Sequence, residues 1–156
     1  MLKFHRPRTP TVMRTHTIIL LIALNLLTGC SQEPAIEQLL QRVEALEQAV
    51  EERKVDTAMD ILSKDFSTSK GQNRKDAHRL LLFHTLKHQT ISVIRSQTQA
   101  SLDPAYANQA QVRFNAIVTG GQGLLPEQGR SYAVDSRWTF DDGEWYLNSL
   151  DWEPLL

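Results

Sequence analysis

The spacing of the apolar residues changes period near His88, and this change constrains the fold more than any other feature of the chain. Before His88 the apolar residues recur every three or four positions, which is typical of helices that bury one face. After His88 they alternate with polar residues, which is typical of strands. Helices first and an antiparallel meander afterwards predict an α+β domain, in which N-terminal helices pack on a curved antiparallel sheet.

Three helices are expected in the first part of this domain. Residues 36–50 carry one apolar stripe and predict an amphipathic helix. The stripe spans about two heptads, whereas a coiled coil needs roughly three or four, so packing on the domain's own sheet is favoured. Asp56 is expected to cap a helix over residues 57–63, and Asn73 a helix that runs to about residue 87. The inner candidates of this last helix are Leu80, Leu81, Phe83, His84 and Leu86.

The second part predicts strands joined by tight connections. Alternation with β-branched residues predicts strands at residues 91–96, 111–119, 131–140 and 145–152. The sequence Asp-Asp-Gly-Glu at residues 141–144 is a strong hairpin signal. A glycine-rich loop at residues 120–126 separates the middle pair of strands, because glycine reaches backbone angles that other residues avoid.

The N-terminal segment has the layout of a secretion signal. Four basic residues and no acidic residue precede an apolar run of ten residues at 18–27. This run is too short to cross a bilayer as a permanent helix, which needs roughly 20 residues. Translation starts at Met1 or at Met13, and the second start gives the more compact leader.

The end of this leader, Leu27-Thr28-Gly29-Cys30, resembles the lipobox of bacterial lipoproteins. The resemblance implies cleavage between Gly29 and Cys30, and a covalent lipid on the Cys30 sulfur. The alternative is that Cys30 is an ordinary free cysteine. Acyl chains on the protein would hold it at the bacterial envelope. Ser31 after the cysteine resembles the sorting pattern of Gram-negative lipoproteins, and this resemblance implies the outer membrane, with the domain facing the periplasm. We therefore divide the chain into a signal peptide (1–29), a lipidated tether (30–35) and one α+β domain (36–156).

The charge of the remaining chain limits its partners. Removal of residues 1–29 leaves 13 Lys and Arg against 18 Asp and Glu, a formal charge of −5. Nucleic-acid binding calls for a basic face, so nucleic acid is not expected as a partner. The same average charge argues against adsorption to anionic lipid headgroups beyond the lipid anchor itself.

Two segments, residues 55–66 and 136–147, give the domain a family resemblance. Together with the order of the elements over residues 36–152, they resemble the nuclear transport factor 2-like superfamily, which includes ketosteroid isomerase and the polyketide-cyclase (SnoaL-like) relatives. The resemblance implies a cone-shaped, cystatin-like domain with an apolar cavity. It also implies a homodimer through the sheet face, because members of the superfamily often pair there.

Candidate site residues follow from such a cavity. The candidates for its lining are Phe83, His84, Phe114, Tyr132, Trp138 and Phe140; alternatively, these aromatic side chains fill the space as core. A catalytic base would come from His84, His88, Asp135, Arg137 or Tyr106, but strand alternation places Asp135 and Arg137 opposite the aromatic face. His84 and His88 lie four residues apart on one helix face and lack a third ligand in sequence, so neither a catalytic residue nor a metal site is assigned.

The sequence favours a non-catalytic, membrane-anchored module that binds a small apolar ligand or an envelope protein. The alternative is an isomerase, dehydratase or cyclase that acts on a small apolar substrate in the cone. A third interpretation is an accessory subunit of an envelope assembly. Apart from the covalent lipid on Cys30, no cofactor is expected.

Overall fold

The computed structural model describes residues 32–121 and 129–155 of the 156-residue chain. The expected signal peptide, the cleavage site at Gly29 and Cys30, and most of the glycine-rich loop lie outside the described residues. The helices are α2 (Gln32–Glu51), α3 (Val55–Ile61) and α4 (Arg74–Lys87); the strands are β1 (Leu62–Ser67), β2 (Thr90–Leu102), β3 (Gln109–Gly121), β4 (Arg130–Asp141) and β5 (Glu144–Pro154). In this part of the chain no helix is both long and apolar enough to cross a membrane.

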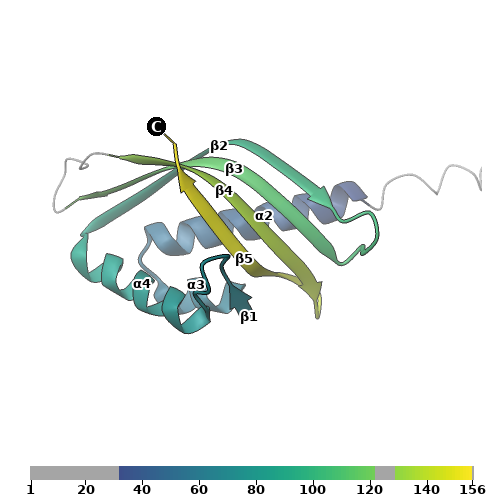
Figure 1. Ribbon diagram of the computed structural model, residues 1–156, viewed down its shortest axis with the longest axis horizontal. Helices are drawn as coiled ribbons and strands as arrows, with labels where there is room; N and C mark the ends of the chain where they lie inside the picture. Colours follow the sequence, from purple (N-terminus) through teal and green to yellow (C-terminus); the bar gives the residue numbers. More distant parts are fainter. Residues whose placement is uncertain (1–31, 122–128, 156) are drawn as a thin grey trace, which may run out of the picture. The chain divides into compact units, whose positions relative to one another are not determined.

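The predicted α+β class is confirmed. The strands form a five-stranded sheet in the order β1-β5-β4-β3-β2. Strands β2 to β5 make an antiparallel meander, and β1 pairs in parallel with β5 at its edge. Figure 1 shows α2, α3 and α4 together on one side of the curved sheet.

Helix α2 packs across the sheet through its apolar stripe. Leu39 and Val43 are buried, because residues four positions apart share one helix face. Ala49 is also buried. The polar side chains of α2 reach the β4–β5 hairpin: Gln38 Nε2 donates to the Gly143 carbonyl at 3.1 Å. The helix therefore packs on the domain's own sheet. It begins at Gln32, so residues 32–35 of the expected tether are helical.

The second helix differs from the prediction at both ends. Helix α3 begins at Val55 after the N-cap Lys54, which makes no side-chain capping bond, so Asp56 lies in the first turn and is not the cap. The helix ends at Ile61, and the chain enters β1, where Leu62 pairs with Leu147 of β5. Residues 62 and 63, expected to be helical, are therefore extended. The register with β5 decides this conformation, and a local pattern does not encode such a distant partner.

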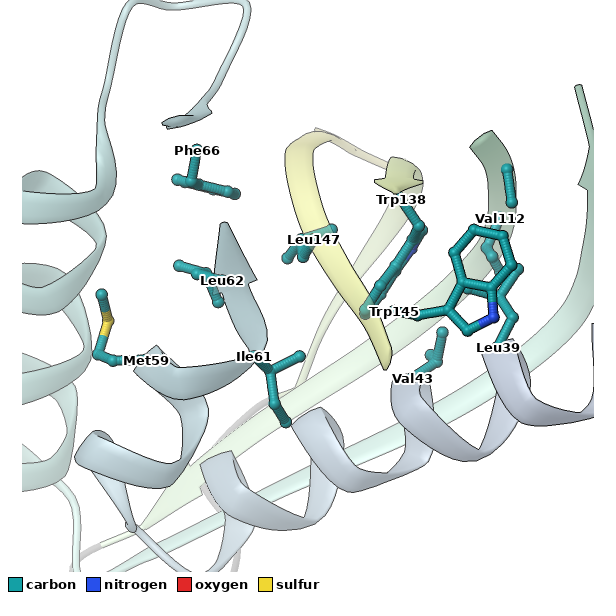
Figure 2. Packing of buried hydrophobic residues seen from close by; sticks show 11 residues of the cluster. Leu39, Val43, Met59, Ile61, Leu62, Phe66, Val112, Trp138, Trp145 and Leu147 are labelled. Carbon is teal, nitrogen blue, oxygen red and sulfur yellow. The ribbon is translucent and has the colours of Figure 1, made fainter. Parts of the chain in front are cut away.

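The hydrophobic core lies between α2 and the sheet. Figure 2 shows Trp138 and Trp145, from β4 and β5, beside Leu39 and Val43 of α2. Both tryptophans are 2% exposed. The predicted hairpin between β4 and β5 is confirmed: Asp142 and Gly143 have φ of 48° and 84°, the left-handed pair that a two-residue type I′ turn requires.

Candidate functional site

An apolar cavity of about 150 Å³ lies beneath α4. It is enclosed by the C-terminal half of α2, by β1, by α4 and by the second half of β5. Its lining residues are Leu46, Val50, Leu62, Phe66, Thr68, Gln72, Asp76, Ala77, Leu80, Leu81, Leu147, Leu150 and Trp152. Such a cavity, with aliphatic and aromatic walls, can hold a small apolar molecule, because it offers apolar surface and few polar groups.

Two polar side chains of this lining, Thr68 and Asp76, are engaged in local structure. The Thr68 hydroxyl accepts the backbone N–H of Gln72 at 3.2 Å, within the turn that joins β1 to α4. Asp76 belongs to the capping box of α4: its carboxylate accepts the backbone N–H of Asn73 at 3.0 Å and forms an ion pair with Arg79. These hydrogen bonds, that from Asn73 first, lower the pKa of Asp76 below its ordinary value.

A proton-transfer site needs a group whose pKa lies near the working pH. Asp76 is the only ionisable side chain among the described lining residues, and its lowered pKa keeps it ionised at neutral pH. The described cavity can therefore bind an apolar group, but it presents no tuned acid or base.

The aromatic residues and His84 that were candidates for lining a cavity lie elsewhere in the domain. None of the six candidates is among the described lining residues of this cavity. Trp138 is core: its Nε1 donates to the Ser136 hydroxyl at 3.0 Å, and that hydroxyl donates to the Val112 carbonyl at 2.9 Å. Phe140 packs against the Trp145 ring, with ring centroids 5.3 Å apart.

Two further candidates, Phe114 and Tyr132, are half-buried on β3 and β4. The Arg95 guanidinium lies 5.9 Å from the centre of the Phe114 ring. Phe114 also borders a shallow groove of about 450 Å³ on the sheet, which is lined mainly by polar side chains such as Gln97, Asn115 and Asp135. Neither ring is among the described lining residues of the cavity beneath α4.

Phe83 and His84 lie on the outward side of α4, which corrects the expectation that they face inward. Phe83 is 57% exposed, and its ring meets His84 edge-on at 5.4 Å. The His84 and His88 rings stack at 5.9 Å. Partial burial, followed by the neighbouring charges of His88 and Lys87, lowers the pKa of His84. No group of three metal-binding side chains occurs among the described residues.

The polar strand residues behave as surface groups. Asp135 accepts hydrogen bonds from the Gln111 side chain at 2.8 Å and from Arg113 at 3.2 Å. Arg137 is exposed on the same face of β4. Tyr106 is 60% exposed between β2 and β3. None of these three catalytic candidates reaches the cavity beneath α4.

Comparison with known proteins rests on the fold. No family model matches the chain, and no curated protein matches its sequence. A protein from Streptomyces avermitilis of the nuclear transport factor 2-like family, named as a proposed dehydratase, gives a TM-score of 0.67 at 14% identity; the match covers 80% of this chain and 98% of that one. A protein of unknown function with a cystatin-like fold, from Nostoc punctiforme, gives 0.60 at 12% identity over 76% and 89%.

The chain has the nuclear transport factor 2-like fold. Bd1075 of Bdellovibrio bacteriovorus shares it, with a TM-score of 0.66 at 15% identity over 76% of this chain, but this chain spans only 41% of Bd1075. At these identities the likeness establishes the fold and no activity.

Within the nuclear transport factor 2-like fold, sequence reasoning missed most of the cavity lining. Leu62 was expected in a helix, yet it belongs to β1 together with Phe66. Leu46 and Val50 were part of the predicted stripe of α2, and their spacing of four residues was the available signal. Leu147, Leu150 and Trp152 face the cavity from either side of a bulge in β5, where the pairing with β4 shifts between Arg137 and Trp138. A local sequence pattern does not place such a bulge.

Proposed function

We propose that this chain is a lipid-anchored, periplasm-facing module of the bacterial envelope that binds a small apolar ligand beneath α4 without transforming it. The observation that carries the binding part is the character of the cavity. Its walls are aliphatic and aromatic, and its one described carboxylate is committed to the cap of α4. The lipid part rests on the lipobox-like sequence that ends in Cys30.

The size of the cavity limits the ligand. Ordinary small-molecule pockets measure about 300–1,000 Å³, so a cavity of about 150 Å³ is small. An apolar cavity of roughly this size accommodates a molecule such as benzene. The expected ligand is therefore a single ring or a short alkyl chain, including the end of a longer lipid.

Ligand binding can be tested with a series of short alcohols of increasing chain length. We expect the melting temperature of the chain to rise with each added methylene until the cavity is full. Ala77→Leu adds apolar atoms to the α4 side of the cavity and should abolish this rise while the fold is retained. Ala107→Leu adds the same atoms at an exposed loop position and should leave the rise intact. Equal responses of the two variants would contradict binding in this cavity.

Anchoring has a separate test. Cys30→Ser should release the chain from the membrane fraction and remove the mass of the acyl chains, because only a thiol can carry the thioether. The melting temperature of the released domain should not change. A chain that stays in the membrane fraction with the same mass would contradict lipid attachment.

Catalysis is the second candidate, favoured by the fold shared with the S. avermitilis protein named as a proposed dehydratase. An isomerase, dehydratase or cyclase needs an acid or base at the substrate. Asp76 is the only such group among the described lining residues. Turnover of a small apolar substrate that disappears in Asp76→Asn, without loss of fold, would favour this candidate over simple binding.

A second copy of the chain is the proposed partner for the outer face of the sheet. Ile94 and Ile117 are directly opposite each other on β2 and β3, and they are 59% and 42% exposed. A pair of exposed isoleucines favours contact with another apolar surface. Ile94→Lys should lower the dimer fraction in sedimentation experiments, and a monomeric parent protein would contradict the proposal.

A further inference from the structure

The outward side of α4 exposes three large apolar side chains that nothing in the described chain covers. Leu82, Phe83 and Leu86 are 39%, 57% and 84% exposed. Thr85 is the one buried residue of this helix. Single exposed apolar residues are common, but several that adjoin on one helix face mark an interaction surface.

Basic residues are interleaved with these apolar side chains. Lys75, Arg79 and Leu86 lie on one face, because they are separated by four and seven residues. Leu82 and Phe83 fall within the same exposed arc, and the Lys87 ammonium lies 5.9 Å from the centre of the Phe83 ring. We call these six residues the α4 outer surface: Lys75, Arg79, Leu82, Phe83, Leu86 and Lys87.

The charge of α4 is opposite to that of the rest of the domain. The helix contains four Lys and Arg and one acidic residue, Asp76, which is paired with Arg79. Residues 30–156 outside α4 contain nine Lys and Arg against seventeen Asp and Glu. The domain is therefore negatively charged on average, whereas α4 has an excess of positive charge.

A helix with exposed Leu and Phe beside Lys and Arg has the chemistry of a segment that lies in the interface of an anionic bilayer. The apolar side chains enter the boundary between headgroups and acyl chains, and the cations remain among the phosphates. We propose that the α4 outer surface rests on anionic lipid and is a second membrane contact of this domain. This inference rests on the proposed anchoring at Cys30.

The position of α4 along α2 places the second membrane contact far from the start of α2, which follows the lipid anchor in sequence. Cys30 precedes the start of α2 in sequence, whereas α4 packs over Leu46 and Val50 in its C-terminal half. A rise of about 1.5 Å per residue puts roughly 20 Å of helix between the start of α2 and Leu46. The lipid and the α4 outer surface would thus hold the domain at two separated points, and the second contact becomes intramolecular once the first is made. The acidic remainder of the domain, repelled by the same lipid, then faces away from the bilayer.

The test uses fluorophores and vesicles that contain brominated lipids, which quench a fluorophore inserted among them. Labels are placed on Leu86→Cys, in the α4 outer surface, and on Glu153→Cys, at the exposed end of β5. Each is made with Cys30 intact and with Cys30→Ser. Vesicles are phosphatidylcholine alone or phosphatidylcholine with phosphatidylglycerol, and mass spectrometry records the acyl chains on Cys30.

We expect the label at position 86 to be quenched several-fold more than the label at position 153, with phosphatidylglycerol present. Replacing Lys75, Arg79 and Lys87 by Gln should weaken this interaction about tenfold or more, since each surface cation contributes to attraction by anionic lipid. Replacing Arg113, Arg130 and Arg137 by Gln removes the same charge from the strands and should not weaken it.

The outcomes separate this inference from the proposed anchoring. Acylated Cys30 with equal quenching of the two labels would overturn the membrane contact and leave the anchor standing. A bare thiol with selective quenching at position 86 would overturn the anchor and support the contact. The label at position 86 could instead be protected from solvent to the same degree with and without phosphatidylglycerol, and more strongly as the protein concentration on the vesicle rises. That result would show that a second copy covers α4, and it would also overturn the membrane contact.

Discussion

Helices α2 and α4 are the two long helices of the described domain, and they use their apolar residues in opposite ways. Helix α2 buries Leu39, Val43 and Ala49 against the sheet. Helix α4 contains a comparable number of large apolar residues, yet most of them are exposed, and it covers only one side of the small cavity. Since α2 lies across the sheet and α4 beside its β1 edge, only α2 finds partners along its length. Helix α2 therefore stabilises the fold, whereas the exposed side of α4 is available for binding.

The largest expected effect is on the free energy of unfolding, when a buried leucine of α2 and an exposed leucine of α4 are each shortened. Leu39→Ala removes a side chain that is 0% exposed, and it should lower the free energy of unfolding by about 2–5 kcal/mol, through lost burial and the cavity left behind. Leu86→Ala makes the same change at the exposed end of α4 and should alter it by no more than about 0.5 kcal/mol. Urea unfolding of both variants measures the contrast, and similar losses would show that α4 is also a core helix.

The sequence predicted most of the architecture because its signals were local. The stripe of α2, the cap at Asn73 and the Asp142-Gly143 turn each depend on residues a few positions apart, and the structure contains all three. Strand β1 depends on a parallel partner far along the chain, between Leu62 and Leu147. No local periodicity carries that information, so residues 62 and 63, the start of β1, were expected at the end of a helix.

The exposed face of α4 was mispredicted for a different reason. Residues 80–83 are four consecutive apolar side chains, and consecutive residues point to every side of a helix. Periodicity therefore did not decide which of them would be covered. The cavity had the same difficulty, because aromatic type left open whether Trp138 and Phe140 line the cavity or belong to the core. Trp138 belongs to the core and Phe140 packs against it, whereas the cavity is lined mainly by aliphatic side chains together with Phe66 and Trp152.

A smaller effect should come from the cap that begins α4. The Asn73 side chain accepts the backbone N–H groups of Lys75 and Asp76, so Asn73→Ala should cost about 0.5–2 kcal/mol. If α4 has little packing to hold it, amide hydrogen exchange should accelerate along α4 and remain unchanged in α2. Lys54→Ala is the matched control, because Lys54 occupies the N-cap of α3 without a side-chain capping bond. Faster exchange throughout the domain would mean that α4 and α2 unfold as one unit.

The smallest effect concerns the ion pair that joins α2 to β2. Arg95 approaches Glu47 at 2.7 Å, and the two side chains are 20% and 18% exposed. Burial outweighs the attraction of Arg95 and raises the pKa of Glu47 above its ordinary value of 4.5. The folded chain therefore binds this proton more tightly than the unfolded chain does, and the free energy of unfolding falls as the pH rises through the interval between the two pKa values.

Glu47→Gln removes this titration while it keeps the shape of the side chain. We expect the variant to equal the parent below pH 4.5, where Glu47 is protonated, and to be slightly more stable at pH 7, by less than the loss of the cap. Glu37→Gln, at an exposed position of α2, controls for the change in net charge, because Glu37 is not among the charged groups that act on Glu47. A variant that becomes less stable than the parent as the pH rises would show that the attraction of Arg95 outweighs burial. In that case the polar contacts of α2 would stabilise the fold together with its apolar stripe, and the contrast with α4 would widen.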